Sequence, residues 1–162
     1  MRRARREQHT DIALGSELLT PTGGLLRQEA VAAIARPLRD LRSALDDGRA
    51  EAAIGAAKDL VKAACRVVLA AAGATTPTGA SLPRLFTAAA RVIGASDDDL
   101  GRSLTATVQR LAELRNTAGA GHGRALAPDL GLAHARLAAS AGTAVATFLL
   151  SDTGDQVQPG AS

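Results

Sequence analysis

The sequence has almost no aromatic residues. Its 162 residues include no Trp and no Tyr, and the only two Phe are Phe86 and Phe148. Strands are enriched in aromatic and β-branched side chains, so this composition disfavours a β-sandwich or barrel. It also disfavours a site that holds single-stranded nucleic acid by stacking bases on rings. The hydrophobic residues, 46% of the chain, are mainly Ala, Leu, Val and Ile, which suit closely packed helices. We therefore expect an all-α fold.

Cysteine and long hydrophobic runs are equally scarce. Cys65 is the only cysteine, which excludes an internal disulfide and leaves no thiol cluster for a metal. It falls on the apolar side of its expected helix, where an inert buried thiol is typical. The longest weakly charged run, 137–150, is shorter than the ~20 residues of a membrane-spanning helix. We expect a cytoplasmic protein with no membrane partner, no metal and no cofactor.

The charge balance permits a polyanionic partner without requiring one. The formal net charge is +3 and the sequence pI is about 10.0. Much of this charge lies in the first six residues, which read MRRARR. Such a basic start either steers an arm to nucleic acid or is a solvated tail. No apolar segment follows it, so it does not read as a secretory signal.

Hydrophobic periodicity predicts a bundle of about four to five helices in one domain. Residues 1–24 are expected to form a flexible basic arm, 25–152 the helical domain, and 153–162 a disordered tail. Pro37 is expected to kink or divide the first helix. Among the aspartates at 97–99, a helix cap is favoured over a metal site, because successive helical residues point in different directions. The helices are expected at 25–45, 49–72, 81–93, 97 to the motif described next, and 128–150.

One stretch stands out for its chemistry: residues 111–123, LAELRNTAGAGHG. An apolar helical approach leads to Arg115 and Asn116, and His122 follows after a glycine-bearing bridge. A continuous helix would put Arg115 and His122, seven residues apart, on one face. The glycines instead favour a helix end that folds back toward the next helix. Either geometry lets the two side chains converge.

This arginine-to-histidine pattern resembles the motif of the HEPN superfamily, and in particular the abortive-infection C-terminal domain family. The upstream helix at 53–69 and the closing helix at 134–150 resemble those of the family, so the similarity covers about 40–152. It implies a HEPN-like helical bundle and a metal-independent endoribonuclease. Arg115 and His122 match the arginine and histidine that form the family's active site. It also implies a homodimer in which two motifs face each other.

The residues themselves support that chemistry. His122 can act as base or acid near neutral pH, and Arg115 can stabilise charge on a phosphate whose attacking group is the ribose 2′-hydroxyl. Asn116 can orient the phosphate, and Lys58 is a candidate for binding it. His134 is either a third group at the site or a histidine of the core or an interface, where its position on the inward stripe would put it. Arg115 and His122 also have structural readings, as a residue complementing the helix dipole and as a cap of backbone carbonyls.

Three functions are compatible with the sequence. The first is an RNA-cleaving enzyme of a phage-defence or toxin-antitoxin system, with RNA as substrate and an antitoxin or inhibitor protein as partner. The second is a non-catalytic HEPN-like module that binds a protein. The third is a nucleic-acid-binding regulator, whose RNA binding would be sensitive to salt without turnover.

Overall fold

The computed structural model describes the backbone of residues 25–96, 98–118 and 131–155, and the side chains of 30–96, 98–114 and 131–151. These residues form five helices and no strand, so the all-α expectation is confirmed. The helices are α2 (Leu25–Asp46), α3 (Ala50–Ala71), α4 (Leu82–Val92), α5 (Asp99–Ala118) and α6 (Leu132–Asp155). The expected arm at 1–24 and most of the expected tail lie outside the described residues.

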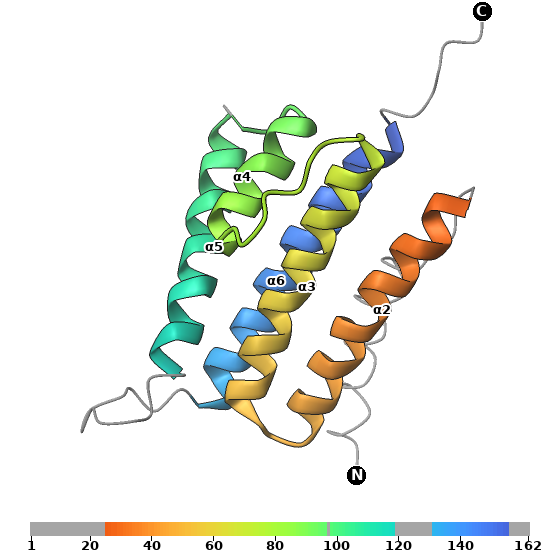
Figure 1. Cartoon of the computed structure of the whole chain (residues 1–162). Helices are drawn as coiled ribbons and strands as arrows, with labels where there is room; N and C mark the ends of the chain where they lie inside the picture. Colours follow the sequence, from red (N-terminus) through yellow and green to blue (C-terminus); the bar gives the residue numbers. More distant parts are fainter. Residues whose placement is uncertain (1–24, 97, 119–130, 156–162) are drawn as a thin grey trace, which may run out of the picture.

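The helix α3 is the centre of the bundle. It packs against each of the other four helices of the described chain (Figure 1). The tight turn between α2 and α3 uses Gly48 at φ 66°, a conformation that glycine adopts at little cost. Helix α3 then runs antiparallel to α2, and α6 lies along its other side. The end of α5, the start of α6 and the α2–α3 turn therefore lie together at the lower end of the bundle in Figure 1.

The core is built mainly from small and branched aliphatic residues. Phe86 is the one ring that is fully buried among the described residues. In the same core cluster, Leu60 and Val68 of α3, Val108 of α5 and Leu149 of α6 have no exposed surface. Alanines fill most of the remaining contacts of α3 and α6, and their small side chains let the two helices lie close together.

Pro37 does not divide the first helix. Helix α2 continues through it from Leu25 to Asp46, so the expected division is wrong. Proline removes one backbone hydrogen bond. Tertiary packing supplies most of a helix's stability, and here Ile34 before the proline and Leu38 and Leu41 after it are all buried.

The buried face of α6 differs from the expected one. His134 and Leu137 were expected to point inward, but His134 is exposed and Leu137 is 67% exposed. Of the other expected positions, Val145 is buried, Ala141 and Phe148 are half-buried, and Leu130 lies outside the described residues. The side facing the bundle is made of small residues and two larger ones: Ala135, Ala138, Ala139, Gly142, Thr143, Val145, Ala146 and Leu149. Helix α6 also begins later and ends later than the expected 128–150.

Candidate functional site

Arg115 and Asn116 lie in the last turn of α5, which the structure describes as helical to Ala118. Their side chains fall outside the described residues, as does His122 with the bridge that contains it. The helical approach to the motif is therefore confirmed. The convergence of Arg115 with His122 stays a prediction.

The start of α5 is fixed by a cap. The backbone N–H of Gly101 donates a hydrogen bond to the Oδ1 atom of Asp98, with an N···O distance of 2.5 Å. Asp98 directly precedes the helix and Gly101 is its third residue, which is the usual N-cap geometry. The preference for a cap over a metal site at the aspartates is thus supported by Asp98, whereas Asp97 lies outside the described residues.

The packing of α5 fixes which row of the helix faces the bundle. Val108 and Leu111 are both buried, with relative exposures of 0% and 3%. Arg115 follows them by seven and four residues, so its backbone position belongs to the same row of the helix. Arg115 therefore occupies the bundle-facing row of the last turn of α5. That turn lies at the end of the bundle where α6 begins.

His134 lies in the first turn of α6, at the same end of the bundle. Its side chain is exposed, and within the described part of the chain this side chain makes no hydrogen bond or ion pair. A role as a core histidine is therefore wrong. Its place in the site, or in an interface, remains a prediction.

Lys58 is separated from this end of the bundle. It is half-buried on α3, eight residues after Ala50, which corresponds to about 12 Å along the helix axis. The structure thus brings the positions of Arg115, Asn116 and His134 to one end of the bundle. Lys58 lies further along the central helix.

The comparison with protein families identifies the domain. The family model of the HEPN-like domain Abi_C matches residues 32–152, which is most of the chain and includes the whole stretch from Arg115 to His122. The chain belongs to this HEPN-like family. Neither the curated proteins nor the solved structures gave a significant match.

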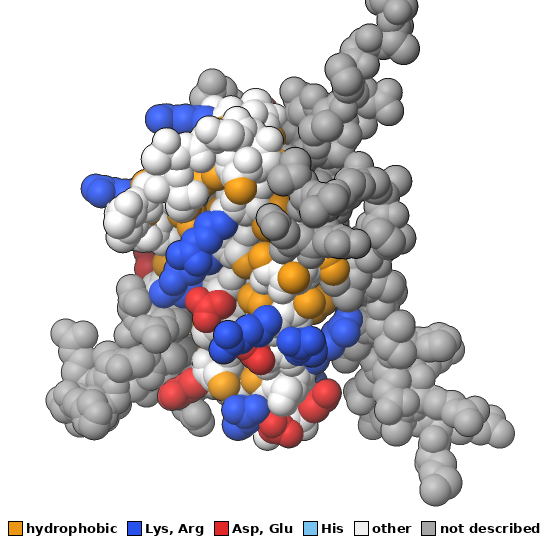
Figure 2. All heavy atoms as spheres, turned by 45° about the vertical axis from the view of Figure 1, so that its right-hand side comes forward, with side chains coloured by type: hydrophobic (Ala, Val, Ile, Leu, Met, Phe, Trp, Pro, Cys, Tyr) orange, Lys and Arg blue, Asp and Glu red, His pale blue; other side chains and the backbone are white. Residues whose placement is uncertain are grey.

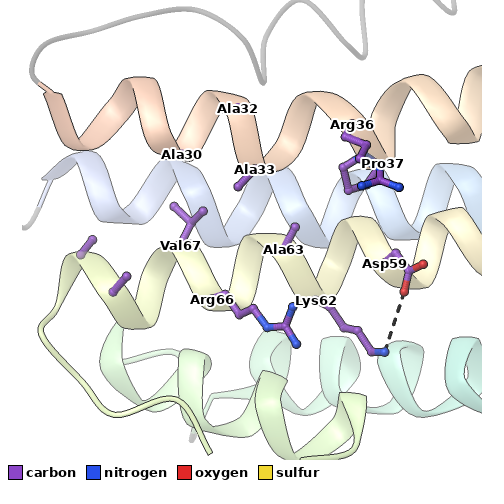
Figure 3. Close-up of a pocket in the computed structure, with 12 residues that line it drawn as sticks. Ala30, Ala32, Ala33, Arg36, Pro37, Asp59, Lys62, Ala63, Arg66 and Val67 are labelled. Atoms are coloured by element: carbon purple, nitrogen blue, oxygen red, sulfur yellow. Dashed lines mark ion pairs between the residues drawn. The ribbon is translucent and has the colours of Figure 1, made fainter. Parts of the chain in front are cut away.

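The HEPN-like domain also has a hollow that sequence reasoning missed. It lies between α2 and α3, has a volume of about 570 Å³, and is lined by alanines together with charged residues (Figure 3). The charged residues are Arg36 of α2 and Asp59, Lys62 and Arg66 of α3. A sequence signal for it existed, because the basic residues of α3 recur every four positions.

Cys65 contributes no reactive group to the HEPN-like domain. Its side chain is fully buried in the core, and this burial raises the pKa of the thiol to about 12. A thiol that stays protonated is a poor nucleophile and a poor metal ligand. The expectation of an inert buried thiol is confirmed. Within 25–96, 98–118 and 131–155, each helix is too short or too polar to cross a membrane.

Proposed function

We propose that this HEPN-like domain is a metal-independent endoribonuclease with Arg115 and His122 at its active site. The observation that carries the proposal is that the family match at 32–152 contains the whole Arg115-to-His122 motif. The packing of α5 supports it, because the row of Val108 and Leu111 brings the Arg115 position to the bundle-facing side of the last turn. Ligand sites of helical bundles lie between helices, and the end of α5 and the start of α6 lie at the same end of this bundle.

The proposed reaction needs only groups of the protein and the RNA. His122 removes the proton of a ribose 2′-hydroxyl, whose oxygen attacks the adjacent phosphorus. Arg115 stabilises the negative charge that grows on the phosphate oxygens. The bond from phosphorus to the 5′-oxygen breaks, and that oxygen receives the proton that His122 took up. The products are a 2′,3′-cyclic phosphate and a 5′-hydroxyl, and the amide of Asn116 orients the phosphate.

The biological setting is proposed from the same family relationship. We place the protein in the cytoplasm, in a phage-defence or toxin-antitoxin system, as a homodimer whose two motifs face each other. An enzyme that cuts cellular RNA requires restraint, so an antitoxin or inhibitor protein belongs to the same proposal.

The decisive experiment compares wild type with His122→Ala and Arg115→Ala on labelled mixed-sequence RNA in excess chelator. Loss of a positioned histidine should slow cleavage by about 10²–10⁴-fold. Arg110→Ala is the matched control for Arg115, because Arg110 is an exposed arginine of the same helix that pairs only with Glu113 among the described residues. It should cleave at the wild-type rate. The ends of the fragments should be cyclic phosphates.

One observation favours the alternative, a non-catalytic protein-interaction module. Leu137 and Leu100 are large apolar residues that are 67% and 52% exposed. Exposed leucines of this kind are common at protein-binding surfaces, although single ones are also normal. Folded wild type that leaves RNA intact, or that cleaves no faster than His122→Ala, would favour the module over the enzyme.

A further inference from the structure

The central helix carries its positive charges in a single row. Helix α3 contains three basic residues, Lys58, Lys62 and Arg66, and each follows the previous one by four positions. Four residues are slightly more than one turn, so successive side chains lie above one another with a rise of about 6 Å. We call these three residues the α3 cation row. The opposite side of α3 is buried against α6 and α4.

The α3 cation row borders the hollow between α2 and α3. Lys62 and Arg66 line this hollow together with Arg36 of α2, and its remaining charged residue is Asp59. Figure 3 shows the side chains of Lys62 and Arg66 lying next to each other along α3. Figure 2 shows Lys and Arg side chains on this face beside a hydrophobic patch, with Asp and Glu gathered toward its lower part.

The positive charge of the residues that line the hollow is only weakly neutralised. Arg66 is exposed, and no carboxylate of the described residues lies within ion-pair distance of it. Lys62 lies 3.8 Å from the Oδ1 atom of Asp59, and the Asp59 side chain is 65% exposed. Arg36 lies 3.8 Å from the Oδ2 atom of Asp40, and both side chains are largely exposed. The Lys62 side chain is 30% exposed, so water reaches both pairs, and ion pairs that water reaches contribute about 0–1 kcal/mol.

We propose that the α3 cation row binds the phosphate backbone of single-stranded RNA. The choice of RNA rests on the proposed function. Helix α3 starts at the end of the bundle that carries Arg115 (Figure 1). Measured along the helix axis from that start, the row begins at about 12 Å and ends at about 24 Å. One strand can therefore contact the row while a neighbouring segment lies at the motif. Binding is independent of sequence, because phosphate contacts position a strand without reading its bases.

RNA fits this surface better than an acidic protein does. Evenly spaced cations suit a polymer with regularly repeated charges, and a sequence pI of about 10.0 favours a polyanion. Half of the residues that line the hollow are alanines and none is aromatic, so the hollow offers no aromatic anchor to a protein partner and no platform on which a base could stack.

The test measures binding in the full chain with cleavage disabled by His122→Ala. The probe is a fluorescein-labelled single-stranded RNA of about 15 nucleotides, titrated by anisotropy between about 50 and 200 mM salt. The row variant carries Lys62→Gln and Arg66→Gln in addition to His122→Ala. The matched control adds Arg84→Gln and Arg91→Gln, which remove the same charge from exposed positions on α4. Thermal melting followed by circular dichroism checks that each variant is folded.

The double variant in the row should bind about tenfold or more weakly at the lower salt concentrations. Its slope of log affinity against log salt should become shallower by about 1.4, because each phosphate contact to a single strand contributes about 0.7. The α4 control should keep the parent slope. Single-stranded DNA should lose affinity through the same two residues, since both polymers present phosphates.

Three results would overturn the proposal. One is equal weakening by both double variants, which would reflect overall charge. Another is no weakening by either. The third is displacement of the RNA by polyglutamate as effectively as by unlabelled RNA at equal charge concentration, which would make the row a surface for acidic proteins.

The result separates this proposal from the ribonuclease itself. In the His122→Ala background, binding is measured whether or not the wild type cleaves. If the row variant binds RNA more weakly and the wild type does not cleave it, RNA binding by the row is supported and ribonuclease activity is rejected. In the active protein, the two row substitutions should raise KM and leave kcat near the wild-type value. If the row substitutions leave both KM and the cleavage rate unchanged, ribonuclease activity is supported and RNA binding by the row is rejected.

Discussion

Gly142 of α6 faces Ala57 of α3 at the closest approach of these two helices. A methyl group built on Gly142 would lie 3.1 Å from the carbonyl oxygen of Ala57 and 3.2 Å from its Cβ atom. Ala57 is fully buried on the central helix, so its backbone has little freedom to move away. The absence of a side chain at Gly142 therefore sets how closely α3 and α6 pack.

Gly142→Ala should destabilise the domain. Overpacking in a well-packed core costs about 1–3 kcal/mol, which exceeds the gain of about 1 kcal/mol from alanine's higher helix propensity. Gly55→Ala is the matched control, because Gly55 is also inside a helix but has no neighbouring atom within 4 Å of the place that a methyl group would take. It should be more stable than wild type by up to about 1 kcal/mol. Urea unfolding of the three proteins measures both effects, and equal stability of the two variants would contradict the close approach.

Asp98→Ala should remove the cap of α5. The loss of the hydrogen bond from the Gly101 N–H should cost about 1 kcal/mol. For a domain of this size, that corresponds to a melting temperature lower by about 2–4 °C. Asp98→Asn keeps an accepting oxygen at the same place and should melt close to the wild type. If Asn were as destabilising as Ala, the charge of Asp98 rather than its hydrogen bond would be responsible.

The sequence predicted the helices of this domain well because their ends carry local signals. Gly73 and Gly94 adopt positive φ two residues after the ends of α3 and α4, and Pro83 lies in the first turn of α4. The expected ends of α3 and α4 therefore lie within one residue of the observed ones. These signals act through the backbone of a few neighbouring residues, so they can be read without knowing the tertiary structure.

The face of α6 could not be predicted in the same way. Its residues are apolar or small on nearly every side, so periodicity did not define one inward stripe. The sequence favoured the larger residue Leu137. The close packing against α3 instead selected Ala138 and Gly142, because only small side chains fit there. Which side of an alanine-rich helix is buried depends on its partner helix, and that information is not local.

The candidate site could be predicted only as far as its residue types and their order. The family pattern identified Arg115 and His122, and the structure adds the bundle-facing row of Arg115 through its register with Leu111. The surface formed by the α3 cation row could be recognised only in the structure, because α2 contributes to it. Arg36 comes from a different helix and meets Lys62 and Arg66 around the hollow only after folding.

Leu137→Gln tests the observed register of α6. Leu137 is 67% exposed, so a polar residue there should change the free energy of unfolding by no more than about 0.5 kcal/mol. Leu149→Ala on the same helix removes a fully buried side chain and should cost about 2–5 kcal/mol. Urea unfolding measures both variants. A large loss for Leu137→Gln would mean that Leu137 is buried, in this domain or in an interface between copies, and dilution of the protein separates those two cases.

Cys65 should make the stability of the domain fall at alkaline pH. Burial raises the pKa of the folded thiol to about 12, above its ordinary value of 9.0. The unfolded chain therefore ionises first, and the contribution of the neutral thiol is fully present below pH 9.0 and is lost as the pH rises toward 12. In this window the loss has a slope of up to about 1.4 kcal/mol per pH unit.

Cys65→Ala isolates this effect from the titration of lysines. The variant lacks the thiol, so it should be less stable than wild type by a constant amount below pH 9.0, because a buried side chain is shortened. Above that pH the difference should shrink, since only the wild type continues to lose the thiol contribution. Urea unfolding of both proteins in steps from about neutral pH into the alkaline range measures the difference directly. A difference that stays constant across the whole range would show that the thiol ionises as easily in the folded protein as in the unfolded chain, and would contradict its burial in the core.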